Sequence, residues 1–195
     1  MLERLGFSFA RARACPVAAW DTMDGSTLST LGSVDLSRAQ RMFGGTAWTV
    51  HRVDLHTELL HLATTTDTTT VSDAKGRGEG PPVKLRLNSE VVGATSDGVI
   101  LLRDGTRHSA DLVVAADGLH SVLRDVVVGE EQEGSAKRPT HSSMAAFRFL
   151  VETDVLERDP VLGPLLATRR GKATMLVDTK DTEHERHIMW YACRG

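Results

Sequence analysis

The feature that most constrains the fold is an apolar run that ends in an Asp-Gly pair and leads into residues with helical spacing. The run covers residues 111–116 and is followed by Asp117 and Gly118. Apolar residues then recur with helical spacing from Leu119 to Val126. A nearly continuous apolar run is typical of a strand that is buried on both faces of a parallel sheet. The segment therefore predicts a strand, a tight turn and a helix in an α/β fold.

This predicted turn has the chemistry of a nucleotide site. In α/β folds, ligands bind at the carboxyl ends of the strands, which is where Asp117 and Gly118 would lie. A glycine at this point lets a ligand approach the backbone closely, and the free N–H groups of the next helix attract phosphate. The residues alone indicate a dinucleotide site. They fit equally well an ordinary corner in which Asp117 caps the helix.

A second helix is expected after residue 54. Leu55, Leu59 and Leu62 fall on one helical stripe, and we expect Asp54 to be the N-cap of this helix. Arg52 then lies just before the helix N-terminus.

The rest of the chain is expected to be mostly strands. We expect an irregular segment over residues 1–45 and a flexible insertion at about 64–82, which is rich in Thr, Gly and Pro. Alternating apolar residues and the Asp104-Gly105 turn predict a β-meander between residues 83 and 109. A short helix is expected over 159–166, and further strands over 145–151, 174–177 and 187–192.

Composition excludes several classes of protein. The chain has 195 residues, 41% of them hydrophobic, which is enough for a real core. Its 23 basic and 26 acidic residues give a net charge of −3, and aromatic residues make up 5%, so no nucleic-acid partner is expected. No apolar run is long enough to span a membrane. Cys15 and Cys193 show no metal or disulfide spacing. We expect a cytoplasmic protein with reduced thiols and no metal site.

Four segments together resemble a known enzyme family. The longest runs from Ala110-Asp111 through Ala116-Asp117-Gly118 and His120-Ser121 to Arg124. It resembles the Asp-Gly fingerprint of flavin-dependent aromatic hydroxylases of the salicylate hydroxylase and p-hydroxybenzoate hydroxylase type. The other segments that resemble this family lie at residues 2–7, 48–56 and 187–195.

The resemblance implies an FAD-dependent monooxygenase that hydroxylates a small aromatic molecule with NAD(P)H and O₂, in a setting such as secondary metabolism. It implies that Arg52, Asp117 and Gly118 bind the cofactor, and that Arg148 and Tyr191 contact the substrate as candidate catalytic residues. An arginine within an apolar strand is costly unless it is paired, which favours a role for Arg148. The alternatives are that Arg148 faces solvent, that Tyr191 only packs, and that Arg52 pairs with an acidic neighbour on its helix.

The resemblance covers only the central part of such an enzyme. The Gly-x-Gly-x-x-Gly turn that opens the family and its later Gly-Asp motif are absent from the sequence. We therefore expect a truncated α/β chain, with some α+β character. Residues 1–135 would form an incomplete FAD-binding Rossmann-like domain with the β-meander, and residues 136–195 part of a substrate-domain sheet. The alternatives are a non-catalytic remnant or partner-dependent fragment, and a different α/β module that binds NAD(P)H or ADP. The sequence leaves the oligomeric state open.

Overall fold

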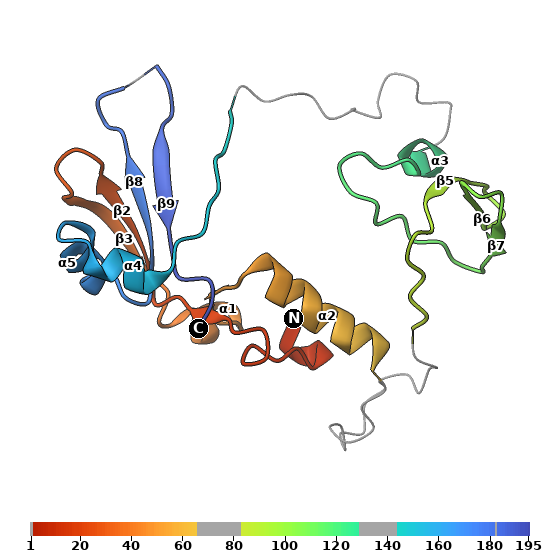
Figure 1. Ribbon diagram of the computed structural model, residues 1–195, viewed down its shortest axis with the longest axis horizontal. Coiled ribbons are helices and arrows are strands. Elements are labelled where there is room, and N and C mark those ends of the chain that lie inside the picture. Colours follow the sequence, from red (N-terminus) through yellow and green to blue (C-terminus); the bar gives the residue numbers. More distant parts are fainter. Residues whose placement is uncertain (1, 66–82, 129–143, 182) are drawn as a thin grey trace. The chain divides into compact units, whose positions relative to one another are not determined.

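The computed structural model describes residues 2–65, 83–128, 144–181 and 183–195. It divides into two compact units (Figure 1). The first unit comprises Met1–Lys84 with Leu150–Gly195, and the second comprises Leu85–Phe149.

A four-stranded mixed sheet organises the first unit, with strand order β3-β2-β8-β9. The two central strands are parallel and come from opposite ends of the chain, since Ala19 is aligned with Lys172. The two outer pairs are antiparallel. The bounds are β2 Ala19–Asp24, β3 Thr30–Asp35, β8 Lys172–Val177 and β9 His187–Trp190.

The prediction that residues 1–45 are irregular is wrong, because β2 and β3 form a hairpin there. Its turn is held by the Asp24 carboxylate, which accepts hydrogen bonds from the N–H groups of Ser26 and Thr27 at 2.8 and 2.7 Å. One face of the central pair is fully buried at Met23 and Thr174. Because β2 contains several polar residues, it lacks the hydrophobic alternation from which a strand would have been predicted.

Shorter elements complete the first unit. A two-stranded sheet pairs β1 with β4, and Figure 1 shows α4 and α5 beside the four-stranded sheet. The helix expected over 159–166 is present as α5, which begins three residues later, and α4 before it was not predicted. The bounds are η1 Leu2–Leu5, β1 Cys15–Pro16, α1 Ala39–Phe43, β4 Trp48–Thr49, α2 Arg52–Thr64, α4 Thr153–Arg158 and α5 Leu162–Ala167.

The second unit contains the predicted meander as an antiparallel sheet, β5-β6-β7. Residues 83–87, expected to be its first strand, are not in a strand. Gly98 makes the tight turn between β5 and β6 with φ +84°, and a Cβ there would lie 2.3 Å from the carbonyl oxygen of Ala110. The bounds are β5 Val91–Ala94, β6 Val99–Leu102, β7 Arg107–Ser109 and α3 Arg124–Val128.

The buried strand expected over 111–116 is not present. The segment forms neither strand nor helix, and the side chains of Leu112 and Val114 are 78% and 75% exposed. A strand needs a neighbour for its backbone groups, and none of the described strands is adjacent to it. For the same reason residues 145–151 are not a strand. The helix expected from Leu119 begins only at Arg124.

The chain is a mixed α/β structure with several sheets, as predicted. The predicted domain boundary at residue 135 and residues 66–82 of the predicted insertion lie outside the described residues.

Candidate cofactor and substrate site

The Asp117 carboxylate organises the turn before α3. It accepts hydrogen bonds from the Ser121 hydroxyl at 2.7 Å and from the N–H groups of Val122 and Leu123 at 2.7 and 3.2 Å. The hydrogen bond from Ser121, followed by those from the backbone, holds the pKa of Asp117 below its ordinary value. All three donors precede α3, so the carboxylate closes the turn and does not cap the helix, and it is ionised near neutral pH.

Gly118 leaves open space beside this turn. Its φ is +79°, a conformation that side chains disfavour, and no atom lies within 4 Å of the position a Cβ would take. The Arg124 guanidinium fixes the far side of the turn by donating to the carbonyl oxygen of Leu119 at 3.0 Å. The turn is thus rigidly held, and its backbone is accessible to a ligand.

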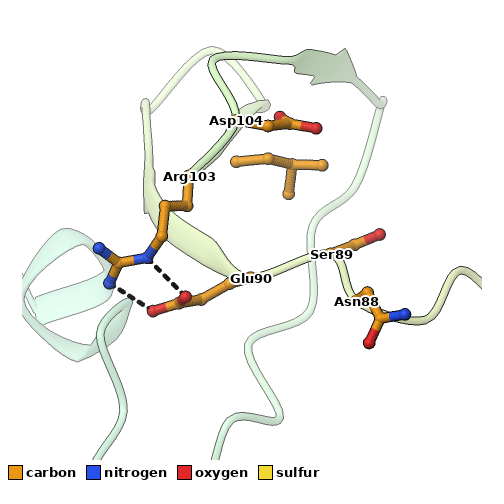
Figure 2. Close-up of a pocket in the computed structure, with 6 residues that line it drawn as sticks. Asn88, Ser89, Glu90, Arg103 and Asp104 are labelled. Carbon is orange, nitrogen blue, oxygen red and sulfur yellow. Dashed lines mark hydrogen bonds and ion pairs between the residues drawn. The ribbon is translucent and has the colours of Figure 1, made fainter.

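Two open hollows lie in the second unit. The larger, of about 480 Å³, is lined in part by residues 113–117 and His120, so it adjoins the Asp-Gly turn. The smaller, of about 260 Å³, lies at the start of β5 (Figure 2). There the Arg103 guanidinium makes two hydrogen bonds to the Glu90 carboxylate, both 2.5 Å long. These charges neutralise each other, so the larger hollow is the better candidate for a ligand.

Arg52 is the first residue of α2 and is exposed. Its guanidinium makes no hydrogen bond or ion pair with any residue that the structure describes. The two acidic residues considered as its partners are engaged elsewhere: Asp54 with Arg194 and Glu58 with Arg11. The ion pair within the helix, which was the alternative to a cofactor contact, is therefore not formed, and the charge of Arg52 remains available to an anionic group.

The prediction that Asp54 is the N-cap of α2 is wrong. The N-cap is His51, whose backbone is extended, and Asp54 lies in the first turn. A carboxylate in the first turn still stabilises a helix through the helix dipole. Here the carboxylate also receives two hydrogen bonds from Arg194, at 2.6 and 2.7 Å.

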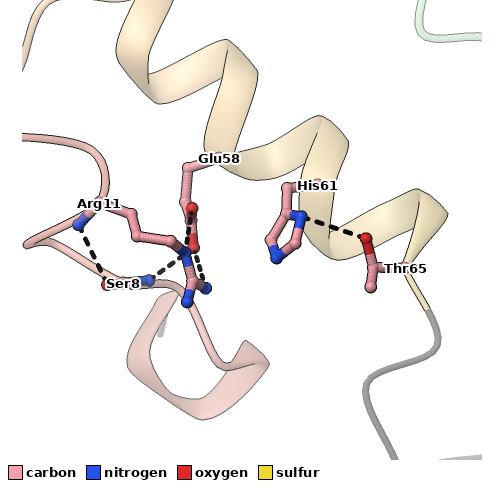
Figure 3. Close-up of polar contacts among 5 residues, drawn as sticks. All are labelled: Ser8, Arg11, Glu58, His61 and Thr65. Carbon is pink, nitrogen blue, oxygen red and sulfur yellow. Dashed lines mark hydrogen bonds and ion pairs between the residues drawn. The ribbon is translucent and has the colours of Figure 1, made fainter.

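The middle of α2 carries a buried carboxylate, Glu58, which is 3% exposed. It accepts hydrogen bonds from the Ser8 N–H at 2.9 Å and from the Arg11 Nε and Nη2 atoms at 2.9 and 2.7 Å (Figure 3). The ion pair with Arg11 lowers the pKa of Glu58. This contact fastens the segment before β1 onto the helix.

A second buried carboxylate, Asp21, lies in β2. It accepts hydrogen bonds from Ser33 at 2.6 Å, from Arg169 at 2.6 Å and from Lys172 at 2.9 Å. Burial alone would raise the pKa of Asp21, but these three partners outweigh burial and lower it. The cluster ties three strands of the sheet together and was not predicted, because its members are far apart in the sequence.

The candidate substrate residues are exposed. Arg148 lies in an extended segment of the second unit and not in a strand, so the argument from burial in an apolar strand does not apply to it. Tyr191 follows β9 in the first unit and is 48% exposed. Arg52 belongs to the first unit with Tyr191, whereas Asp117 and Gly118 belong to the second with Arg148.

In the part of the chain that the structure describes, no group of His, Cys, Asp or Glu could hold a metal ion. No described helix is both long and apolar enough to cross a membrane. Both cysteines are free, and burial raises the pKa of the Cys15 thiol, which favours its neutral form.

Comparison with known proteins identifies relatives of one kind. The chain is 35% identical over 162 residues to hispidin-3-hydroxylase of Neonothopanus nambi, which covers 77% of this chain and 34% of that protein. It is 30% identical over 183 residues to the FAD-dependent monooxygenase phomE of Diaporthe leptostromiformis, which covers 89% of this chain and 42% of the relative. The chain thus spans about a third to two fifths of the length of these relatives.

Other comparisons add less. No protein-family model matches the chain. Among solved structures, the tetrameric form of 2-methyl-3-hydroxypyridine-5-carboxylic acid oxygenase matches with a TM-score of 0.45 and 23% identity, over 65% of this chain and 28% of that one.

Proposed function

Because this chain is a homologue of the FAD-dependent monooxygenases, we propose that it is part of an enzyme that hydroxylates a small aromatic molecule with NAD(P)H and O₂. The observation that carries the proposal is the similarity to hispidin-3-hydroxylase, at 35% identity over 77% of the chain. The resemblance to aromatic hydroxylases rests on the Asp-Gly segment and the segment around Arg52, and the proposal is supported by the exposure of Gly118 and Arg52 in the structure. The proposal includes the two predicted domains, residues 1–135 and 136–195, and a cytoplasmic location.

Each candidate cofactor residue, taken singly, has chemistry that suits a part of a flavin dinucleotide. Arg52 offers an exposed guanidinium without a partner among the described residues, which suits a phosphate or the polar edge of a flavin. Gly118 offers a backbone with open space where a side chain would stand. Asp117 shapes this turn and keeps a negative charge, which suits hydrogen bonding to a ribose hydroxyl.

The bound FAD would supply the oxygen-transfer chemistry, after reduction by NAD(P)H and reaction with O₂. The chain's own part is to orient the aromatic ring and to favour its reactive form. A phenol reacts better as a phenolate, and the Arg148 guanidinium would stabilise that charge. Tyr191 would donate a hydrogen bond to a polar group on the ring and so fix its orientation.

A second candidate function is supported by the exposed apolar side chains. Phe147 is 93% exposed and Phe149 is 83% exposed, far more than is typical of large aromatic side chains in a folded protein. Such a surface is consistent with a non-catalytic fragment that depends on a partner for stability.

The proposal is tested with protein made from the complete transcript. We expect it to oxidise NAD(P)H and to release a hydroxylated product when it is supplied with simple hydroxybenzoates. Arg148→Ala should reduce product formation at least about 10-fold while FAD stays bound, as expected when an electrostatic contact to the reacting group is lost. Arg107→Ala, at an exposed arginine in β7, is the matched control. Absence of product with every substrate would favour the non-catalytic fragment.

A further inference from the structure

Residues 191–195, which follow β9, form a cluster of contacts with the elements around the start of α2. The Thr49 hydroxyl of β4 donates to the carbonyl oxygen of Ala192. The N–H of Gly195 donates to the carbonyl oxygen of Arg13 at 2.9 Å, and the Arg13 Nε donates back to Gly195 at 2.9 Å. The last segment of the chain is therefore anchored on both sides of Arg194.

Arg194, which lies within this anchored segment, binds the first turn of α2. Its Nε and Nη2 atoms donate to the two carboxylate oxygens of Asp54, at 2.6 and 2.7 Å, in the forked geometry that gives the strongest arginine pairs. Its Nη2 atom also lies 3.3 Å from Nδ1 of His51, the N-cap residue. Because a guanidinium only donates, Nδ1 must be the acceptor in this contact. Arg194 thus binds both the N-cap and the first turn.

In the sequence, Arg52 lies between His51 and Asp54, the two residues that Arg194 binds. It is the first residue of α2, flanked by His51 and by the turn that carries Asp54, and its own side chain is exposed. The direction in which Arg52 leaves the helix depends on the backbone of this turn. Within α2 the Thr57 hydroxyl donates to the carbonyl oxygen of Val53, and from outside the helix Arg194 contacts this turn and its N-cap.

We propose that Arg194 is a positioning residue for cofactor binding: by holding Asp54 and His51, it fixes the turn from which Arg52 reaches the flavin. This inference rests on the proposed function, because it requires that Arg52 contacts FAD. It also couples the end of β9, near the candidate substrate residue Tyr191, to the cofactor contact. A substitution at the end of β9 would then alter flavin binding without any direct contact between Arg194 and the cofactor.

The proposal is tested first without cofactor, by hydrogen exchange in the full chain. The first backbone hydrogen bond of α2 runs from the Leu55 N–H to the carbonyl oxygen of His51. Arg194→Gln should speed amide exchange in this turn by about 3-fold, the factor expected for the loss of a partly exposed ion pair. The matched control is Glu90→Gln, which breaks the equally forked pair with Arg103 in the other unit and should leave α2 unchanged.

The second test is a double-mutant cycle on FAD affinity, measured by flavin fluorescence with protein from the complete transcript. Arg194→Gln should raise the dissociation constant by about 3-fold to 5-fold, and Arg194→Lys should restore part of the loss. In an Arg52→Ala background, Arg194→Gln should have almost no further effect, because the residue acts through Arg52.

The outcomes separate the two proposals. Unchanged exchange in α2 in Arg194→Gln overturns the positioning role. An equal loss of affinity with and without Arg52 overturns it too, because Arg194 would then act independently of Arg52. A wild-type protein that binds no FAD overturns the proposed function and with it the flavin role of both arginines, even if exchange shows that Arg194 holds the helix.

Discussion

Glu58 provides the sharpest test of how α2 is held in place. The change is Glu58→Gln, which keeps the size of the side chain and one acceptor oxygen but removes the charge. The native carboxylate is 3% exposed and accepts three hydrogen bonds, two from Arg11 and one from the Ser8 N–H. The amide of glutamine would place an NH₂ group against one of the Arg11 donors, so at least one hydrogen bond is lost.

The expected cost lies between two reference values. Breaking a fully buried ion pair costs about 3–5 kcal/mol, whereas exposed pairs are worth about 0–1 kcal/mol. Glu58 is buried but the Arg11 side chain is 53% exposed, so we expect a loss of about 2 kcal/mol in the free energy of unfolding. For a chain of this size, that corresponds to a fall of about 4–8 °C in Tm.

The loss depends on pH in a definite direction. Because the pKa of Glu58 is lower in the folded state, its stabilisation is complete above the ordinary glutamate pKa and disappears as the pH falls through the lowered value. The difference in stability between wild type and Glu58→Gln should therefore be largest near pH 7 and should shrink as the solution is acidified below about pH 4.

The assay is urea unfolding followed by tryptophan fluorescence, because Trp20, Trp48 and Trp190 all belong to the first unit. The matched control is Glu157→Gln, since Glu157 is 41% exposed and pairs with an exposed arginine, Arg170. The control should lose less than about 1 kcal/mol. Equal losses in the two variants, or a difference from wild type that grows on acidification, would refute the reasoning.

Further predictions concern the turns and the candidate site. Gly98→Ala should destabilise the second unit by more than about 3 kcal/mol, because its Cβ would lie 2.3 Å from the carbonyl oxygen of Ala110, and loss of circular dichroism on mild heating would reveal it. Gly118→Ala meets no atom and should cost only about 1–2 kcal/mol from its positive φ, yet it should weaken FAD binding in a fluorescence titration. Arg52→Ala should purify with less flavin than wild type, by absorbance, and a fully yellow variant would contradict its role. Arg148→Ala should stay yellow but lose turnover, and a variant that keeps full turnover would contradict that role.

Local patterns predicted the elements that depend on local contacts. The leucine stripe after residue 54 identified α2, and the Asp104-Gly105 turn identified the β6–β7 hairpin. Both elements form from residues close in the sequence, so their spacing contains the necessary information. The exact start of α2 was missed, because Asp54 is held by Arg194, which follows it by 140 residues.

The elements that depend on distant partners could not be predicted in this way. Strand β2 pairs with β8, which lies near the other end of the sequence. The polar sequence of β2 gives no indication of this pairing. Conversely, the apolar run over 111–116 has the composition of a buried strand but no neighbouring strand in the described structure, so it forms no strand and most of it is exposed. The same difference between local and distant contacts applies to the candidate site. The Asp117 turn is formed by residues close in the sequence and was predicted, whereas the distant partners of Glu58 and Asp54 were not predicted.

The most direct test of the proposed function is the flavin content of the protein made from the complete transcript. The protein is purified without added cofactor, denatured, and the released flavin is identified and compared with the amount of chain. The account predicts FAD in stoichiometric amount, and a marked reduction of it in Arg52→Ala. A well-folded protein that contains no FAD and takes up none when FAD is added would contradict the account.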